Sequence, residues 1–228
     1  MKALIFDSGP LINLSMNGLL YLLEKLKKDF NGKFLITKEV KYETIDHPIN
    51  IKKFELGALR IKNLLEQNII ELPDYLKLNQ KKMDTETDEI MDMANHFFKI
   101  ESNWMNLVSR AEISCLALSS ELERLGFETI IAIDERTTRL LSEKPENLQK
   151  ILSEKLHQRI EVIAENFEIF KKYKFIRSSE IIFVAYKKGL INLQGRNVLD
   201  ALLYATRFHG SSITTEEIEE LKKIAKNS

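Results

Sequence analysis

The first fourteen residues show the alternation of apolar and polar positions around which the chain is organised. The apolar run 3–6 ends at Asp7, and a turn with Ser8 and Pro10 leads into an amphipathic pattern that begins at Leu11. Proline is favoured in the first turn of a helix, and Asp or Ser before it can cap the exposed amides. The stretch predicts a buried strand, a tight turn and a helix. Asp7 is then either a helix cap or a carboxylate at the ligand-binding end of a parallel sheet.

The same order of strand and helix recurs along the chain. Leucines at helical spacing predict one helix over 11–26, and short apolar runs predict further parallel strands at 34–37, 129–133 and 159–163. The run 69–72 predicts another extended segment. Because helical patterns separate these strands, the alternation implies right-handed crossovers and an α/β fold with a parallel sheet.

Residues 74–106 differ in character from the rest of the chain. Basic and acidic side chains mix loosely there around one amphipathic stretch at 88–100. We interpret this part as a helical insertion rather than as part of the sheet.

The end of the chain is helical in pattern, with amphipathic stretches at 179–188, 197–208 and 215–225. We expect these helices to pack on the sheet or to offer a surface to a partner. The predicted domains are therefore an α/β domain over 1–191, which contains the insertion, and a C-terminal helical extension over 192–228 packed on it.

Composition narrows the class of protein. The 34 Lys and Arg residues balance the 34 Asp and Glu residues, so a nucleic-acid site must be local. The single cysteine, Cys115, falls among leucines at helical spacing, where a small buried residue is expected, and no disulfide framework exists. Apolar runs are too short for a signal peptide or a membrane span, so we expect a cytoplasmic protein with no membrane contact.

Acidic residues occupy equivalent places near one predicted edge of the sheet. Asp7 and Asp134 end strands, while Glu43 and Glu112 lie in the first turns of helices that begin there. Four converging carboxylates repel one another unless a cation compensates them. Mg²⁺ or Mn²⁺ prefers such oxygen ligands and can activate water for phosphodiester hydrolysis.

Each of these acids also has a purely structural interpretation. Glu112 stands three residues after Ser109, which is a capping box; Asp134 is a candidate helix cap, and Glu43 a solvated side chain. It is their joint placement that favours a metal site.

Basic residues near this edge are candidates for substrate contacts. Arg136 and Arg139 follow Asp134, where a guanidinium can hold a phosphate; the alternative is a surface arginine paired with Glu135 or Glu143. The basic and aromatic run 171–177 resembles a single-stranded RNA surface, but a solvated loop is the interpretation we favour.

Other site classes are excluded by spacing. The four histidines, which are His47, His96, His157 and His209, show no ligand pair for zinc. Gly9 alone is not a phosphate loop, and Ser8 lacks the flanking glycines of a hydrolase nucleophile.

The motifs together resemble those of PIN-domain proteins. The segment 6–14 is similar to the opening of an archaeal and bacterial group with an Asp-x-x-Pro-Leu-Ile signature. The segments 40–43, 111–118 and 133–139 follow in the order of the second, third and fourth motifs of the family. In the third motif, Ala111 and Ser114 stand where the family usually has a glycine and a second acid.

The resemblance implies a PIN-like three-layer α/β/α fold and a metal-dependent endoribonuclease. Asp7, Glu43, Glu112 and Asp134 would bind Mg²⁺ or Mn²⁺ and carry the catalysis. Ser8, Arg136 and Arg139 would contact RNA, expected to be single-stranded. The alternatives are a non-catalytic PIN-like module that binds RNA or protein, and a toxin-type ribonuclease controlled by an antitoxin. A homodimer would also agree with the resemblance.

Overall fold

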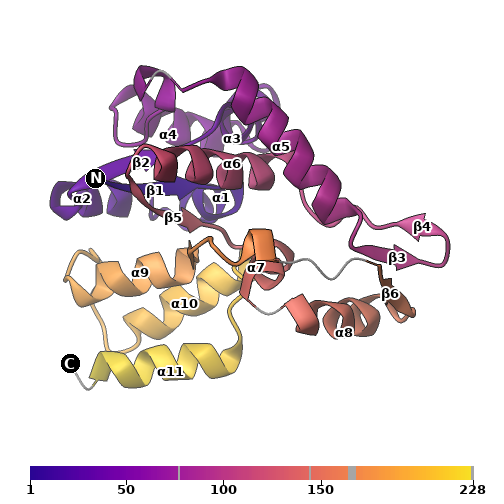
Figure 1. Ribbon diagram of the computed structural model, residues 1–228. Helices are drawn as coiled ribbons and strands as arrows, with labels where there is room; N and C mark the ends of the chain where they lie inside the picture. Colours follow the sequence, from indigo (N-terminus) through magenta and orange to yellow (C-terminus); the bar gives the residue numbers. More distant parts are fainter. Residues whose placement is uncertain (77, 144, 164–167, 227–228) are drawn as a thin grey trace.

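A four-stranded parallel sheet is the frame of this α/β protein. The computed structural model describes residues 1–76, 78–143, 145–163 and 168–226 (Figure 1). In spatial order, the strands of the sheet are β2 (Gly32–Leu35), β1 (Lys2–Phe6), β5 (Glu128–Ala132) and β7 (Phe175–Ile176). The expected strands at 3–6, 34–37 and 129–133 are thus confirmed within two residues at their ends.

The register of the sheet decides which side chains meet at its edge. Phe6 of β1 pairs with Ala132 of β5, so the two central strands end level with each other. Asp7 and Asp134 therefore leave the sheet at the same edge, as the sequence predicts.

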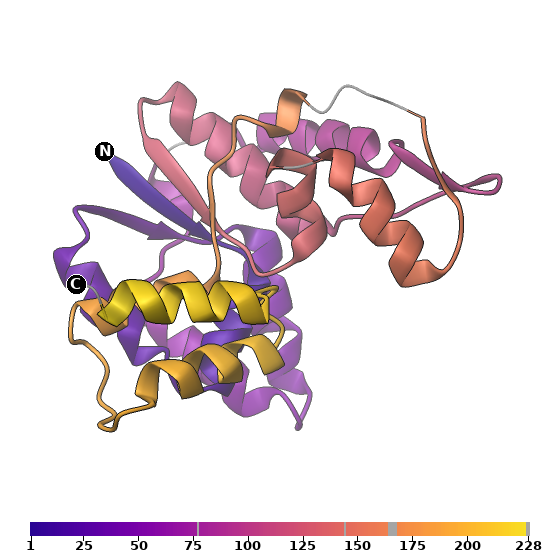
Figure 2. The ribbon, with the colours of Figure 1, turned by 90° about the horizontal axis from the view of Figure 1, so that it is seen from below.

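Helices cover the sheet and fill the connections between its strands. In Figure 1, α5 and α6 lie above the strands, and α9, α10 and α11 lie below them; Figure 2 shows the same lower helices from beneath. The α-helices are α1 (Ser8–Met16), α2 (Tyr21–Asp29), α3 (Lys38–Lys41), α4 (Glu55–Glu66), α5 (Gln80–Asn95), α6 (Arg110–Arg124), α7 (Arg136–Glu143), α8 (Pro145–Leu156), α9 (Ser178–Lys187), α10 (Val198–Phe208) and α11 (Thr215–Lys226). Shorter turns are the π-helix η1 (Tyr42–Asp46) and the 3-10 helices η2 (Pro48–Asn50), η3 (Pro73–Leu76) and η4 (Glu168–Phe170).

The helix α6 is the buried centre of the upper layer. Every residue from Ala111 to Leu122 is buried, because α6 packs on β1 and β5 on one side and on α5 on another. Small residues such as Cys115 and Ala117 permit this close packing, and Cys115 is a buried thiol as expected. A helix buried on most sides holds its first turn, and hence Glu112, in a fixed place.

The predicted helix over 11–26 is in fact two helices. The chain breaks at Gly18, whose φ of +68° is the left-handed conformation that glycine tolerates best. Leu19 N–H donates to Leu14 O (2.7 Å), which closes α1 in the manner of a Schellman motif. Both helices bury their leucines in the same core, so leucines recur at helical spacing on both sides of Gly18. The spacing alone therefore predicted one continuous helix.

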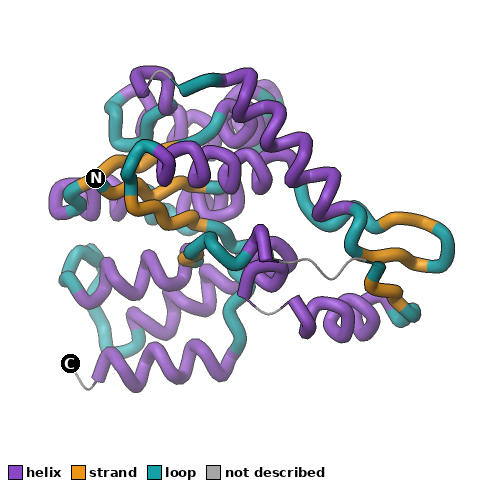
Figure 3. The backbone as a smooth tube through the Cα atoms, viewed as in Figure 1, coloured by secondary structure: helices purple, strands orange, loops and turns teal. Residues whose placement is uncertain are grey.

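The segment 159–163 was predicted as a parallel strand, and this is wrong. Its strand β6 (Ile160–Val162) pairs antiparallel with β3 (Phe98–Ile100), which also pairs with β4 (Asn103–Trp104) in a separate small sheet, seen in orange at the right of Figure 3. The fourth parallel strand is instead β7, in the run 171–177 that we interpreted as a solvated loop. A strand of two or three residues is too short to show the alternation of apolar and polar side chains that marks a strand. The local sequence therefore does not predict which strand it pairs with.

The insertion and the tail follow the expected helical character with shifted bounds. The predicted helix 88–100 ends at Asn95 and begins earlier, at Gln80, while its last residues form β3. Thr214 and Glu217 form a capping box before α11, because the N–H of Thr214 donates to Glu217 Oε2 (2.8 Å) and the N–H of Glu217 donates to Thr214 Oγ1 (3.2 Å). The division into domains at residue 191 stays a prediction. Among the described residues, no helix combines the length and apolar character needed to cross a bilayer.

Candidate carboxylate site

Asp7 follows β1 directly and caps α1. Its Oδ2 accepts a long hydrogen bond of 3.4 Å from the N–H of Gly9. The other oxygen, Oδ1, is buried and has no hydrogen-bond partner within the described part of the chain. Burial raises the pKa of Asp7 to about 7, and the charge of Glu112 adds to this rise. Hydrogen bonds from the N–H groups of Ser8 and Gly9 lower the pKa but do not offset the effect of burial. A buried oxygen without a partner is costly, so Oδ1 is an atom that a ligand would stabilise.

Glu112 lies in the first turn of α6 and completes the predicted capping box. Ser109 Oγ accepts from the N–H of Glu112 (3.2 Å), and Glu112 Oε2 accepts from the N–H of Ser109 (3.0 Å) and from the hydroxyl of Thr138 (2.9 Å). Burial raises the pKa of Glu112 to about 7 against the hydrogen bond from Ser109, and the charges of Glu135 and Glu43 add to this rise. Because the cap uses Oε2, it does not prevent Oε1 from binding a ligand.

Glu43 reaches the same region from η1. Thr37 caps α3 by accepting from Val40 N–H (3.2 Å), and the chain then widens into the π-helical turn that carries Glu43. Ser8 Oγ donates to Glu43 Oε2 at 2.6 Å, which joins η1 to the start of α1. π-Helical turns are rare and often mark functional sites.

Asp134 ends β5 but is turned toward α9. Its Oδ1 accepts from the N–H and the hydroxyl of Ser178 (2.8 and 2.9 Å), and its Oδ2 accepts from the same hydroxyl (2.7 Å). Burial raises the pKa of Asp134, and the hydrogen bonds from Ser178 and Ser211 oppose this rise. Asp134 thus caps α9 rather than α7, whose first turn is capped by Glu135 accepting from Thr138 N–H (2.9 Å).

A pocket of about 390 Å³ joins three of the four predicted acids. It is lined by Asp7, Ser8, Gly9, Ile12, Glu43, Ser109, Glu112, Glu135, His209 and Gly210, which we call the carboxylate pocket. Asp134 does not line it, although its Cβ would lie 3.4 Å from a Cβ added to Gly9, so Asp134 stands just behind the wall. The structure therefore brings Asp7, Glu43 and Glu112 together.

The chemistry of these donors fits a hard divalent cation only after side-chain movement. Within the described ranges, no group of three or more His, Cys, Asp or Glu side chains is arranged so that it could hold a metal ion. The carboxylates accept hydrogen bonds from Ser8, Thr138 and Ser178 instead. Oxygen donors and the unpartnered Asp7 Oδ1 nevertheless match the preference of Mg²⁺ or Mn²⁺.

Of the three residues predicted to contact the substrate, one lies in the carboxylate pocket and two lie outside it. Ser8 lines the carboxylate pocket, but Arg136 and Arg139 do not. Arg136 is exposed at the start of α7, and Arg139 donates to Ser212 Oγ (3.1 Å) in the loop before α11. The alternative pairing with Glu143 falls on a side chain outside the described part of the structure.

Two titratable residues of the pocket, Glu135 and His209, were not among the predicted site residues. Glu135 adjoins Asp134 and had a local signal, namely a second acid at the end of the same strand. His209 comes from the end of α10, far away in sequence, and no spacing rule connects it to the acids.

A second hollow of about 280 Å³ adjoins the carboxylate pocket, because Glu43 lines both. Lys38 and Arg110 supply positive charge to it, and the exposed ring of Tyr42 borders it. Asp84 and Asp88 of α5 pair with these cations, Asp84 with Lys38 at 2.6 Å and Asp88 with Arg110 at 2.5 Å. Both pairs are exposed, so a polyanion can compete for them at little cost.

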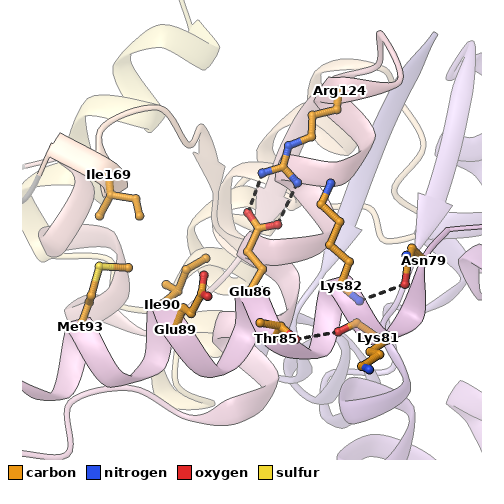
Figure 4. A pocket seen from close by; sticks show the side chains of 10 residues that line it. All are labelled: Asn79, Lys81, Lys82, Thr85, Glu86, Glu89, Ile90, Met93, Arg124 and Ile169. Atoms are coloured by element: carbon orange, nitrogen blue, oxygen red, sulfur yellow. Dashed lines mark hydrogen bonds and ion pairs between the residues drawn. The ribbon is translucent and has the colours of Figure 1, made fainter.

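A larger cavity, of about 540 Å³, lies elsewhere, along α5 (Figure 4). Two of its cations are paired: Arg124 binds Glu86 through two nitrogens (2.9 and 3.2 Å), and Lys82 lies 2.6 Å from Glu121. This cavity is a seam between α5 and α6 rather than a chemical site.

Comparison with known proteins identified no relative of this chain. No protein-family model matches the chain, and neither the curated proteins nor the solved structures contain a match.

Proposed function

We propose that this protein is a PIN-like, Mg²⁺- or Mn²⁺-dependent endoribonuclease whose reaction takes place in the carboxylate pocket. The observation that carries the proposal is the buried Asp7 Oδ1, unpartnered in a pocket with Glu43 and Glu112. Such an arrangement is unfavourable by itself and becomes favourable when a cation is bound.

The residues have distinct roles in this proposal. Asp7, Glu43 and Glu112 would hold the cation, which supplies an activated water and compensates charge on the phosphodiester. Ser8 fixes Glu43, and Thr138 fixes Glu112, through their hydroxyl hydrogen bonds. Asp134 fastens the end of β5 to α9 and stays a predicted fourth ligand.

Support for RNA as substrate comes from the motif resemblance and from the neighbouring hollow. Lys38 and Arg110 offer phosphate contacts, and the exposed Tyr42 offers a ring for a base to stack on. Single-stranded RNA suits this open surface. Control by an antitoxin-like partner and a homodimer stay predictions from the resemblance.

A cleavage assay tests the proposal. Purified protein is incubated with end-labelled single-stranded RNAs and Mn²⁺ or Mg²⁺, beside Asp7→Asn, Glu112→Gln and the control Asp29→Asn. Asp29 is an exposed acid at the end of α2, paired with Lys188. We expect the wild type and Asp29→Asn to cleave, and Asp7→Asn and Glu112→Gln to lose roughly 100-fold or more of the rate.

The non-catalytic alternative also has an observation in its favour. Ser114, where the family usually has a second acid, bonds to Thr37 Oγ1 (2.7 Å) and Ala111 O (2.7 Å) and provides no carboxylate. If the wild type binds RNA but cleaves none with either metal, the binding module is the correct function.

A further inference from the structure

His209 is an exposed residue that lines the carboxylate pocket from the end of α10. It is the C-cap of α10, and the following Gly210 has a φ of +108°, a conformation that favours glycine. Ser211 N–H then donates to Thr206 O (3.1 Å), which closes the turn. The end of α10 is therefore ordered so that His209 borders the pocket.

A chain of polar side chains fixes the orientation of this ring. The buried Asn13 donates through Nδ2 to Thr206 O (2.8 Å), and Asn17 Nδ2 donates to Asn13 O and Oδ1 (3.0 and 2.9 Å). The amide nitrogen of Asn17 is thus engaged, and its Oδ1 meets His209 Nδ1 at 2.8 Å. An amide oxygen only accepts, so Nδ1 must carry a proton and donate.

The second ring nitrogen of His209, Nε2, is left without such a partner in the described part of the chain. No hydrogen bond to Nε2 of His209 is seen among the described residues. With Nδ1 committed to Asn17, Nε2 is the nitrogen available to exchange a proton with a molecule in the pocket.

The other lining groups do not meet one need of phosphodiester hydrolysis. They are carboxylates, serine hydroxyls, glycines and Ile12, so His209 is the one described lining residue that can carry a positive charge. With a cation bound, the carboxylates would be ionised and would accept protons rather than donate them. The leaving ribose oxygen still needs a proton.

We propose that His209 is the general acid of the pocket, donating the Nε2 proton to the leaving oxygen, with Asn17 as its positioning residue. This inference rests on the proposed nuclease function. In the step, a water oxygen bonds to phosphorus as the bond from phosphorus to the ribose oxygen breaks. One water proton passes to a pocket carboxylate, and the imidazolium gives its proton to the departing oxygen, which leaves as an alcohol. The proton on the carboxylate then returns through solvent to the imidazole, so only water is consumed.

The leaving group provides the test. Ribose alkoxide needs a proton, whereas 4-nitrophenolate leaves readily without one. Rates are measured with Mn²⁺ on a single-stranded RNA and on bis(4-nitrophenyl) phosphate for the wild type, His209→Ala, Asn17→Ala and the control His96→Gln. His96 follows α5 and packs on Trp104, outside the carboxylate pocket.

We expect His209→Ala to lose about 100-fold in kcat on RNA but less than about threefold on the aryl ester. Asn17→Ala should lose about tenfold on RNA alone, because its imidazole is less well oriented. His96→Gln should match the wild type on both substrates.

Two outcomes overturn the inference: His209→Ala retains RNA cleavage, or it loses both substrates equally while its circular dichroism stays native. If His209→Ala fails to fold, Asn17→Ala carries the same comparison between substrates. A wild type that cleaves neither substrate refutes the nuclease function itself, which is a different result from failure of the His209 assignment.

Discussion

Asp7 is a residue whose position lowers the stability of the fold. Its pKa lies near 3.8 in the unfolded chain and is raised to about 7 in the fold by burial and by the charge of Glu112. A carboxyl group with a raised folded pKa contributes stability below its unfolded pKa, and this contribution is lost as pH rises toward its folded pKa. The free energy of unfolding should therefore fall between about pH 4 and pH 7.

Asp7→Asn removes the part of this dependence on pH that comes from Asp7. Asparagine can still cap α1 but does not titrate, so the variant should lose less stability than the wild type as pH rises; the raised pKa of Glu112 keeps part of the pH dependence in both proteins. Between pH 4 and pH 8, the difference in free energy of unfolding between variant and wild type should shift by on the order of 3 kcal/mol in favour of the variant. Urea denaturation at both pH values, without added metal, measures this shift. Parallel pH profiles for the two proteins would contradict the burial of an ionisable Asp7.

A site residue can be predicted from the sequence when the residues that position it are its neighbours in the chain. Asp7 and Glu112 were identifiable because a strand end and a capping box are both encoded within a few residues. His209 was excluded as a zinc ligand by its isolation in sequence, and it reached the pocket only through the packing of α10 on α9 and the bond from Asn13 to Thr206. Local spacing cannot report such a contact.

Among the elements, α9 and α11 are joined by Arg177. Its guanidinium is only 7% exposed and pairs with Glu180 on α9 and with Glu217 on α11 (2.9 Å). It also donates to Ser212 O (3.3 Å), close to the segment that holds Asp134. This one side chain therefore fastens the lower helices to the end of β7.

Arg177→Met should lower the free energy of unfolding by about 2 kcal/mol, because the two glutamates lose their shared partner. The exposed Arg136→Met is the matched control and should change it by less than about 0.5 kcal/mol. Urea midpoints of both variants at pH 7 give the comparison. Equal midpoints would show that the Arg177 network adds nothing to stability.

Prediction of elements succeeded where a run was long enough to show its period. The strand at 129–133 and the helix after Ser109 were identified, whereas β6 and β7 were assigned to the wrong structures because each has three residues or fewer. The break at Gly18 was missed because the leucine stripe continues through it. In each case, tertiary packing decided what the local pattern left open.

Across the whole molecule, the candidate site is assembled from distant parts of the chain. Asp7 comes from the end of β1, Glu43 from η1, Glu112 from α6 and His209 from α10. The alternation of strands and helices predicted the sheet edge where the acids meet, but not the contribution of the C-terminal helices. A ligand that contacts these segments together can bind only the folded chain.

If the carboxylate pocket binds one divalent cation, calorimetric titration of the protein with Mn²⁺ at pH 7 will show it. Asp7 and Glu112, with pKa values raised to about 7, each retain part of a proton there, so binding should release about one proton, seen by comparing two buffers. We predict one Mn²⁺ per chain for the wild type and for Asp29→Asn, and affinity at least about tenfold weaker for Asp7→Asn. Equal affinity in Asp7→Asn, or no saturable binding to the wild type, would show that the carboxylate pocket is not a cation site.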